Sequence, residues 1–305
     1  MALPERRDDG PAVRGQRRVG LIDVIFNELD SPWAVEILYG VEEWCSAQGL
    51  AVTVSMARRA VATTRQRGAV RRDDWTSVLA GRDTDGVLLV TVKATVRQLR
   101  RLREAGIPLV VIDPVNLPEH DLPVVSATNR AGGIAATEHL IACGHTRIAA
   151  IGGPEGYLCS HARIDGYRSA LEGAGLRYDP ELVRHGDFQY EGGFLRAVSL
   201  LDLTHPPTAI FAGSDQQAFG VYEAARKRGL RVPQDLSVVG FDDLPMCQWS
   251  CPALTTVRQS LGEIGRVAAE MLGALMEGLT LSSRRIEVAT ELVVRASTAP
   301  PAILR

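Results

Sequence analysis

Short apolar runs rich in valine and isoleucine recur along the chain, and each ends in polar residues. The runs are continuous rather than alternating, which is typical of parallel strands that are buried on both faces. Stretches with helical spacing follow most of them. We therefore expect strands over residues 19–26, 50–56, 85–92, 107–113, 147–153, 207–214 and 236–243.

Apolar residues repeat every three or four positions between these runs, which predicts helices. The first helix is the best defined, with Ser31 as its N-cap, Pro32 as its first helical residue and Gly49 at its end. Asn129 and Ser214 are expected to cap two later helices. The other predicted helices end on glycine and cover residues 94–106, 129–144, 161–175, 214–229 and 261–278.

Alternating strands and helices predict a doubly wound α/β architecture. The units are too many for one simple open sheet. Residues 122–129 form a strand that follows another strand with no helix between them, so we expect the chain to cross there from a first lobe into a second. A single closed (β/α)₈ barrel is the alternative architecture. It fits less well, because residues 286–297 contain two strand pieces without a full helix between them.

Composition is that of a soluble globular protein, with 46% apolar and 23% charged residues and a net charge of −2. No overall positive field draws such a chain to nucleic acid or to an anionic membrane. The five cysteines are odd in number and widely spaced, so we expect reduced thiols. Cys247 and Cys251 have no second pair that would complete a zinc site, and we predict neither a metal nor a cofactor.

The N-terminal residues 1–17 are rich in arginine, proline and glycine and contain no apolar core, so they do not form a secretory signal. We predict a disordered tail or linker there. No run of 18 apolar residues occurs in the chain, so no membrane span and no membrane partner are expected. These features together predict a cytoplasmic protein.

Polar side chains gather where the predicted strands end. In open α/β sheets, ligands bind beyond the carboxyl ends of the strands. Carboxylates accept hydrogen bonds from pairs of hydroxyls, arginine donates to ring and hydroxyl oxygens, and aromatic rings cover the apolar face of a sugar. This set of groups predicts a polyhydroxylated ligand. Its candidate residues are Ser31, Trp33, Thr91, Asp113, Arg163, Phe188, Ser214 and Asp242. Asp215 is assigned to the helix start beside Ser214 instead.

The sequence does not favour catalysis. The glycine-rich run "IGGPEG" is neither a dinucleotide fingerprint nor a phosphate loop, and no nucleophile elbow occurs. Asp242 and Asp243 are sequence neighbours that tend to point apart, rather than a pair that flanks a scissile bond. His145 follows a helix end, where a structural role is expected. We therefore predict that the protein is not an enzyme.

Four stretches carry a resemblance to the regulatory core of LacI/GalR-type bacterial transcription regulators. They are "GGIAATEHLIACGHTRIAAIGGP", "HARIDGYRSALEGAGL", "PTAIFAGSDQQAFGVYEAARKRGLRVPQDLSVVGFDDLP" and "PALTTVRQSLGEIGRVAAEMLGALMEG". The resemblance covers about residues 18–300. It implies two Rossmann-like, periplasmic-binding-protein-like lobes joined by three crossovers. We expect an N-terminal lobe of residues 18–126 plus 259–286 and a C-terminal lobe of 127–258 plus 287–300.

The resemblance also implies a function and further site residues. Arg163 and Asp242 match the family's effector contacts and Phe188 its aromatic wall, whereas Asp113 and Ser214 are weaker matches. Gln259 is placed at a crossover near the cleft. The resemblance implies a homodimeric repressor whose sugar or nucleoside effector alters the DNA affinity of an N-terminal helix-turn-helix.

The N-terminal end departs from that family pattern. The eighteen residues before the first predicted strand cannot form a helix-turn-helix. We therefore expect operator binding to need an N-terminal domain that is not present in this chain. A free-standing sugar-binding protein of a transport system is the alternative function, and an enzyme on a two-lobed fold is the third.

Overall fold

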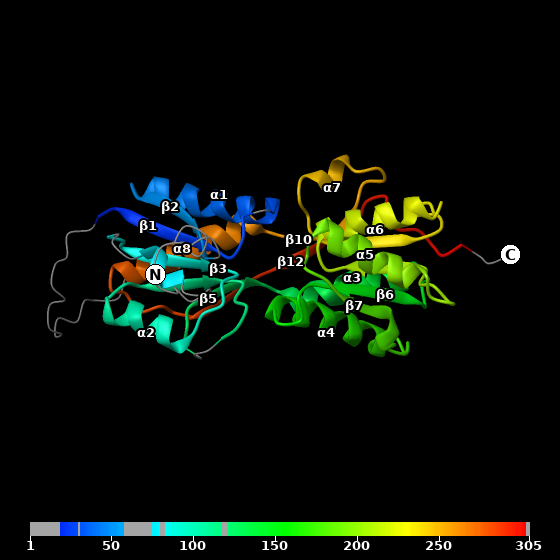
Figure 1. The fold of residues 1–305 in the computed structure, drawn as a ribbon, viewed down its shortest axis with the longest axis horizontal. Coiled ribbons are helices and arrows are strands. Elements are labelled where there is room, and N and C mark those ends of the chain that lie inside the picture. The colour runs from blue at the N-terminus through cyan, green and yellow to red at the C-terminus, as the bar shows by residue number, and fades with distance from the viewer. Residues whose placement is uncertain (1–18, 30, 58–74, 80–82, 118–120, 303–305) are drawn as a thin grey trace, which may run out of the picture.

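The computed structural model describes residues 19–29, 31–57, 75–79, 83–117 and 121–302. The predicted tail, residues 1–17, lies outside the described residues. Two α/β halves lie end to end, each built around a six-stranded sheet (Figure 1). We call the half that contains the first strand the N-terminal lobe and the other half the C-terminal lobe.

The N-terminal lobe has an all-parallel sheet with the strand order β11-β5-β4-β3-β1-β2. Its central strands are almost fully buried, as their continuous apolar sequences predicted. The strands are β1 (Leu21–Phe26), β2 (Ala51–Met56), β3 (Gly86–Val90), β4 (Leu109–Ile112), β5 (Val124–Ala127) and β11 (Arg285–Val288).

The C-terminal lobe repeats this arrangement with the order β12-β10-β9-β8-β6-β7. Only β12 runs antiparallel to its neighbour, β10. The strands are β6 (Ile148–Gly152), β7 (Val183–His185), β8 (Ala209–Ala212), β9 (Ser237–Asp242), β10 (Thr255–Gln259) and β12 (Thr290–Val293). The predicted doubly wound α/β fold with two lobes is confirmed.

The helices cover both sheets, as Figure 1 shows. Those of the N-terminal lobe are α1 (Pro32–Ala47), α2 (Val96–Glu104), α8 (Leu261–Met276) and the short 3₁₀ helix η2 (Trp75–Leu79). Those of the C-terminal lobe are α3 (Asn129–Ala142), α4 (Leu158–Gly173), α5 (Tyr190–Leu201), α6 (Asp215–Lys227), α7 (Met246–Trp249) and the 3₁₀ helix η3 (Pro180–Leu182).

Helix starts show where local sequence decides the structure. Ser31 and Ser214 cap α1 and α6 through their hydroxyl oxygens, as predicted. The prediction for Asn129 was wrong, because it is the first residue of α3 and its side chain makes no cap. Helix α5 was not predicted, since Gly192 and Gly193 weaken its helical pattern.

Three crossovers join the lobes, as predicted. They run from β5 into α3, from β10 into α8 and from β11 into β12. Thr128 and Thr290 bind each other across two of them, with their hydroxyl oxygens 2.9 Å apart. The predicted lobe boundaries lie beside these crossovers: 126/127 and 258/259 fall at the ends of β5 and β10, and 286/287 falls inside β11. The division of the chain at those positions stays a prediction.

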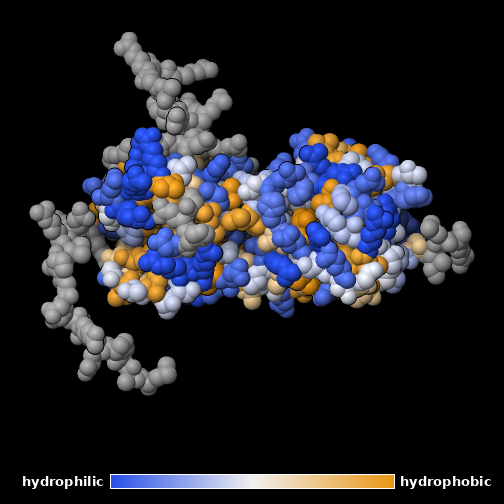
Figure 2. All heavy atoms as spheres, turned by 90° about the horizontal axis from the view of Figure 1, so that it is seen from below, coloured by the Kyte–Doolittle hydropathy of each residue, from blue (hydrophilic) through white to orange (hydrophobic). Residues whose placement is uncertain are grey.

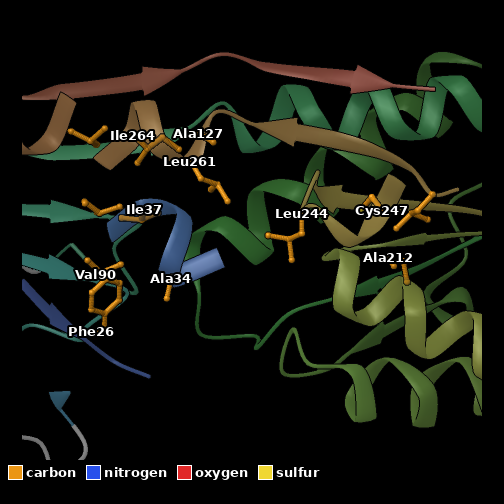
Figure 3. Close-up of a cluster of buried hydrophobic side chains, with 14 of the residues drawn as sticks. Phe26, Ala34, Ile37, Val90, Ala127, Ala212, Leu244, Cys247, Leu261 and Ile264 are labelled. Atoms are coloured by element: carbon orange, nitrogen blue, oxygen red, sulfur yellow. The ribbon is translucent and has the colours of Figure 1, made fainter. Parts of the chain in front are cut away.

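Close helix contacts hold the elements that carry the cleft. A methyl group at Gly40 of α1 would overlap the backbone of Gly262 in α8, and one at Gly133 of α3 would overlap the backbone carbonyl of Arg163 in α4. Apolar side chains fill the space between helices and sheets in both lobes. Figure 3 shows some of them, including Phe26, Val90 and Ile264 in the N-terminal lobe and Ala212 and Cys247 in the C-terminal lobe.

Candidate functional site

A cavity of about 120 Å³ lies between the lobes, at the carboxyl ends of strands from both sheets. The N-terminal lobe contributes the loops after β1, β3 and β4, and the C-terminal lobe contributes those after β6, β7, β8 and β9. This is the position in which parallel α/β sheets bind ligands, because the loops that follow the strands converge there.

Eight of the nine predicted site residues line this one cavity. They are Ser31, Trp33, Thr91, Asp113, Arg163, Phe188, Ser214 and Asp242. Gln259 does not line it and lies behind Asp242, whose Oδ1 accepts a hydrogen bond of 2.6 Å from Gln259 Nε2. The structure therefore brings the predicted set together, with Gln259 as a support for one of its carboxylates.

Arg163 is the most constrained of these residues. Its side chain is 5% exposed and lies 3.7 Å from Asp242, measured from Nη1 to Oδ1. Its Nε donates to Asn129 Oδ1 over 2.8 Å, and Nη1 also donates to the carbonyl of Gly213. The guanidinium carbon stands 3.7 Å from the ring centroid of Phe241. These contacts fix the orientation of the guanidinium before any ligand arrives.

Two buried carboxyl groups flank this guanidinium. Burial raises the pKa of Asp113 to about 6, and the charge of Arg163 opposes that rise. Burial also raises the pKa of Asp242 well above its ordinary value, against the effects of Arg163 and Gln259. Oδ1 of Asp113 is buried and has no hydrogen-bond partner among the residues that the structure describes. An orphaned buried acceptor of this kind is satisfied when a ligand hydroxyl donates to it.

Aromatic side chains form the less polar walls of the cavity. Trp33 comes from the N-terminal lobe, whereas Tyr157 and Phe188 come from the C-terminal lobe. The rings of Tyr157 and Phe188 meet edge to face, with their centroids 6.4 Å apart. Flat rings beside hydroxyl-binding carboxylates suit a molecule that has both an apolar face and polar edges.

Strained backbone is concentrated at the cavity. The described residues include five non-glycine positions with positive φ, and four of them line it: Thr91, Asp113, Phe188 and Asp242. Thr91 is the most unusual, because a β-branched residue rarely adopts its φ of 52°. Such strain persists where the surrounding fold holds a side chain in a required position.

Sequence reasoning missed several residues of the lining. The lining residues outside the predicted set are Asn27, Glu28, Ala34, Pro154, Tyr157, Cys159, Asp187, Gln189 and Gln216. Asp187, Gln189 and Gln216 lie next to predicted residues in the loops or first helical turns, so their position relative to the strand ends would have pointed to them. Asp30, which follows the first strand in sequence, lies outside the described residues.

A hydrogen bond between Asn27 and Tyr157 joins the two lobes across the cavity lining. Asn27 in the loop after β1 donates from Nδ2 to Tyr157 Oη over 3.3 Å. Because the two residues belong to different lobes, separation of the lobes breaks this bond. The contact therefore favours the closed arrangement in which both lobes contribute to one cavity.

We predict that Tyr157→Phe increases the dissociation rate of a molecule bound in the cavity about threefold to tenfold, because one hydrogen bond contributes roughly 0.5–1.5 kcal/mol. Stopped-flow fluorescence measures this rate. Tyr178→Phe is the control, since Tyr178 packs against Tyr167 away from the cavity. An unchanged dissociation rate in Tyr157→Phe would show that the contact does not hold the lobes together.

Other polar residues have structural roles. Asp215 is fully buried and accepts hydrogen bonds from the Leu244 amide and the Thr256 hydroxyl. Asp243 forms ion pairs with Arg258 and Arg295, whereas Asp242 lies beside Arg163, so the two neighbouring carboxyl groups have different partners. His145 binds Thr208 and the carbonyl of Ala299.

Comparisons with known proteins match this geometry. Residues 137–298 match the periplasmic binding protein-like domain family. The transcriptional regulator CelR of Thermobifida fusca is 35% identical over 267 residues, which cover 87% of this chain and 76% of CelR. A solved LacI family regulator from Enterococcus faecium with bound ribose is 26% identical, with a TM-score of 0.80 over 92% of this chain and 99% of that one. The chain belongs to the LacI family of transcriptional regulators.

Other LacI-family members agree with this assignment. The repressor CytR of Escherichia coli is 34% identical over 279 residues, which cover 90% of this chain and 78% of CytR. A solved complex of CelR with cellobiose is 33% identical and has a TM-score of 0.82, over 92% of this chain and 85% of that one. The predicted resemblance is confirmed, and these relatives are transcription regulators rather than enzymes. Within the described residues, every helix is too short or too polar to cross a membrane.

Proposed function

We propose that this chain is the effector-sensing core of a LacI-family transcriptional repressor. A sugar or nucleoside binds in the cavity between the lobes and changes the affinity of the regulator for operator DNA. That DNA is bound through an N-terminal helix-turn-helix, which is not among the residues that the structure describes. The observation that carries the proposal is the cluster of eight sequence-predicted residues around one interlobe cavity.

The arrangement of charges supports a hydroxyl-rich effector. Arg163 donates into a space where Asp113 and Asp242 accept, so a molecule with adjacent hydroxyls can bridge all three side chains. Trp33 and Phe188 supply aromatic faces from opposite lobes. The related structures contain cellobiose and ribose, and both ligands are uncharged and rich in hydroxyls.

Coupling to DNA requires that the effector distinguish two arrangements of the lobes. Its contacts come from both lobes, so it binds the closed arrangement more tightly than an open one. Gln259 supplies a physical link, because it lies at the crossover into α8 and holds Asp242 by a hydrogen bond. A change in the position of the Asp242 carboxylate therefore also moves Gln259, which lies in a segment that joins the lobes.

We also propose that the protein is a cytoplasmic homodimer. Exposed apolar side chains support a side-by-side pair: Val35 and Tyr39 on α1 and Trp249 on α7 are 44%, 66% and 78% exposed. Both helices lie along the upper side of the molecule in Figure 1, one in each lobe. The related lac repressor is a dimer in its complex with operator.

A thermal-shift screen of pentoses, hexoses, disaccharides and nucleosides tests the effector class. A true effector at a hundred times its Kd stabilises the folded state by about 2.7 kcal/mol and should raise Tm by roughly 4 °C. Asp242→Asn should lose this shift, whereas Asp165→Asn, on the exposed face of α4, should keep it. If no sugar or nucleoside raises Tm, the proposed effector class is wrong.

A further inference from the structure

The charges that line the cavity are strongly unbalanced. Four carboxyl groups face it, from Glu28, Asp113, Asp187 and Asp242. Among the described residues, Arg163 supplies the only cationic side chain in the lining. That guanidinium is already engaged by Asp242, Asn129 and the carbonyl of Gly213. The described lining therefore offers an anionic ligand no cationic side chain that is free of a carboxylate partner.

Helix starts are the usual alternative source of positive potential, and four helices begin at the cavity: α1, α4, α5 and α6. Two of these starts, those of α1 and α6, are capped by side chains of the protein. Ser31 Oγ accepts from the Trp33 amide, and Ser214 Oγ accepts from the Gln217 amide at 3.1 Å.

The starts of α4 and α5 have no side-chain cap. At α5, Oδ1 of Asp187 accepts from the amide of the N-cap residue Gln189 at 3.0 Å, so a carboxylate already lies at that start. In the first turn of α4, burial raises the pKa of Cys159; the charge of Arg163 lowers it, whereas Asp113 and Asp242 raise it. Neither uncapped start therefore offers a positive potential that no carboxyl group of the protein opposes.

We propose that the effector is uncharged and that the cleft rejects phosphorylated and other anionic relatives of it. This inference rests on the proposed function and narrows its ligand class. A phosphate group carries about two negative charges and would meet four carboxyl groups and one engaged guanidinium. A hydroxyl, by contrast, can donate to the carboxylates, including the unpartnered Oδ1 of Asp113.

The test uses matched pairs of probes on the same protein. They are ribose with ribose 5-phosphate, glucose with glucose 6-phosphate, and cytidine with cytidine 5′-monophosphate, each measured by calorimetry; cellobiose is added as a neutral disaccharide. We expect the effector to be among the neutral probes and any phosphate ester of it to bind at least about a hundredfold more weakly. Raising the salt concentration from about 0.05 to 0.5 M should reduce the ratio of the affinities for a neutral probe and its ester, because salt screens the repulsion between the phosphate and the carboxyl groups.

Asp187→Asn tests the electrostatic cause. Asparagine keeps the acceptor oxygen that binds the Gln189 amide but removes the charge, so the ratio of the affinities for a neutral probe and its ester should fall about threefold to tenfold. Asp165→Asn removes one exposed charge from α4 without touching the cavity and should leave the ratio unchanged.

The possible results distinguish failure of the charge selection, of the role of Asp187 and of the proposed function. If an ester binds as tightly as its neutral parent, or more tightly, the charge selection is wrong and the effector-binding cleft stands. If a neutral probe binds and Asp187→Asn leaves the ratio unchanged, Asp187 does not contribute to the selection, and its part in the inference is overturned. If neither neutral probes nor esters bind, the proposed function itself fails.

Discussion

Replacing Arg163 with methionine is expected to abolish effector binding and to lower the free energy of unfolding by about 3 kcal/mol at neutral pH. The guanidinium is the shared partner of Asp242 and Asn129, and it rests on the ring of Phe241. Methionine keeps much of the apolar length but leaves two buried carboxyl groups without a nearby cation. The loss therefore combines a missing ligand contact with an uncompensated charge in the folded state.

The effect on stability should depend on pH. The pKa values of Asp113 and Asp242 are raised by burial, and Arg163 holds both lower than burial alone would. A carboxyl group with a raised folded-state pKa stabilises the protein at low pH, and that stability is lost as pH rises through the raised pKa. Removing Arg163 raises both pKa values further, so the difference between variant and wild type should grow from pH 5 to pH 8.

Urea unfolding at several pH values, together with calorimetry using the effector, measures both effects. Arg168→Met is the control, because Arg168 lies on the same helix, is 57% exposed, pairs with Glu172 at the surface and lies over the ring of Tyr178 away from the cavity. The double variant Arg163→Met/Asp242→Asn should recover part of the stability but none of the binding. Unchanged effector affinity in Arg163→Met would remove Arg163 from the site.

The residues of the cleft could be predicted because they follow a rule of topology. In a doubly wound sheet the carboxyl ends of strands meet at one edge, so residues such as Thr91, Asp113 and Asp242 gather there whatever their spacing in sequence. Strands β3, β4 and β9 are continuous apolar runs in the sequence, so the polar residue at the end of each run can be identified.

Contacts between side chains from different segments could not be predicted in this way. Asn129 was expected to cap α3, yet its amide oxygen binds Arg163, which lies 34 positions further along the chain. Gln259 was placed at a crossover near the cleft from the family resemblance, and its Nε2 donates to Oδ1 of Asp242, 17 positions earlier in the chain. Both contacts depend on the relative positions of two segments that are distant in sequence, and the local pattern of hydrophobic and polar residues does not determine those positions.

Gly133→Ala is expected to have the other large effect, lowering the free energy of unfolding by about 3 kcal/mol. A methyl group at this position would meet the carbonyl carbon, carbonyl oxygen and Cα of Arg163. These are backbone atoms, so no side chain can rotate away, and α3 and α4 must move apart. Gly166 opposes it on α4, where a methyl group would meet the backbone of α3.

Urea unfolding followed by tryptophan fluorescence measures the loss. Gly173→Ala is the matched control near the end of α4, where an added methyl group meets nothing within 4 Å and the backbone has no positive φ. That variant should be stabilised by up to about 1 kcal/mol, because alanine is the better helix former. An unchanged urea midpoint in Gly133→Ala would mean that the two helices can separate at no cost.

The same substitution should also weaken effector binding, because the atoms that the methyl group displaces belong to Arg163 itself. The guanidinium reaches Asp242 and the carbonyl of Gly213 from a helix whose distance to α3 is set by glycine. We expect the Kd to rise on the order of tenfold, equivalent to about 1.4 kcal/mol, in conditions where the variant is fully folded. Calorimetry at low temperature measures it. If Gly133→Ala loses stability and keeps full affinity, the position of Arg163 does not depend on the packing of α3 against α4.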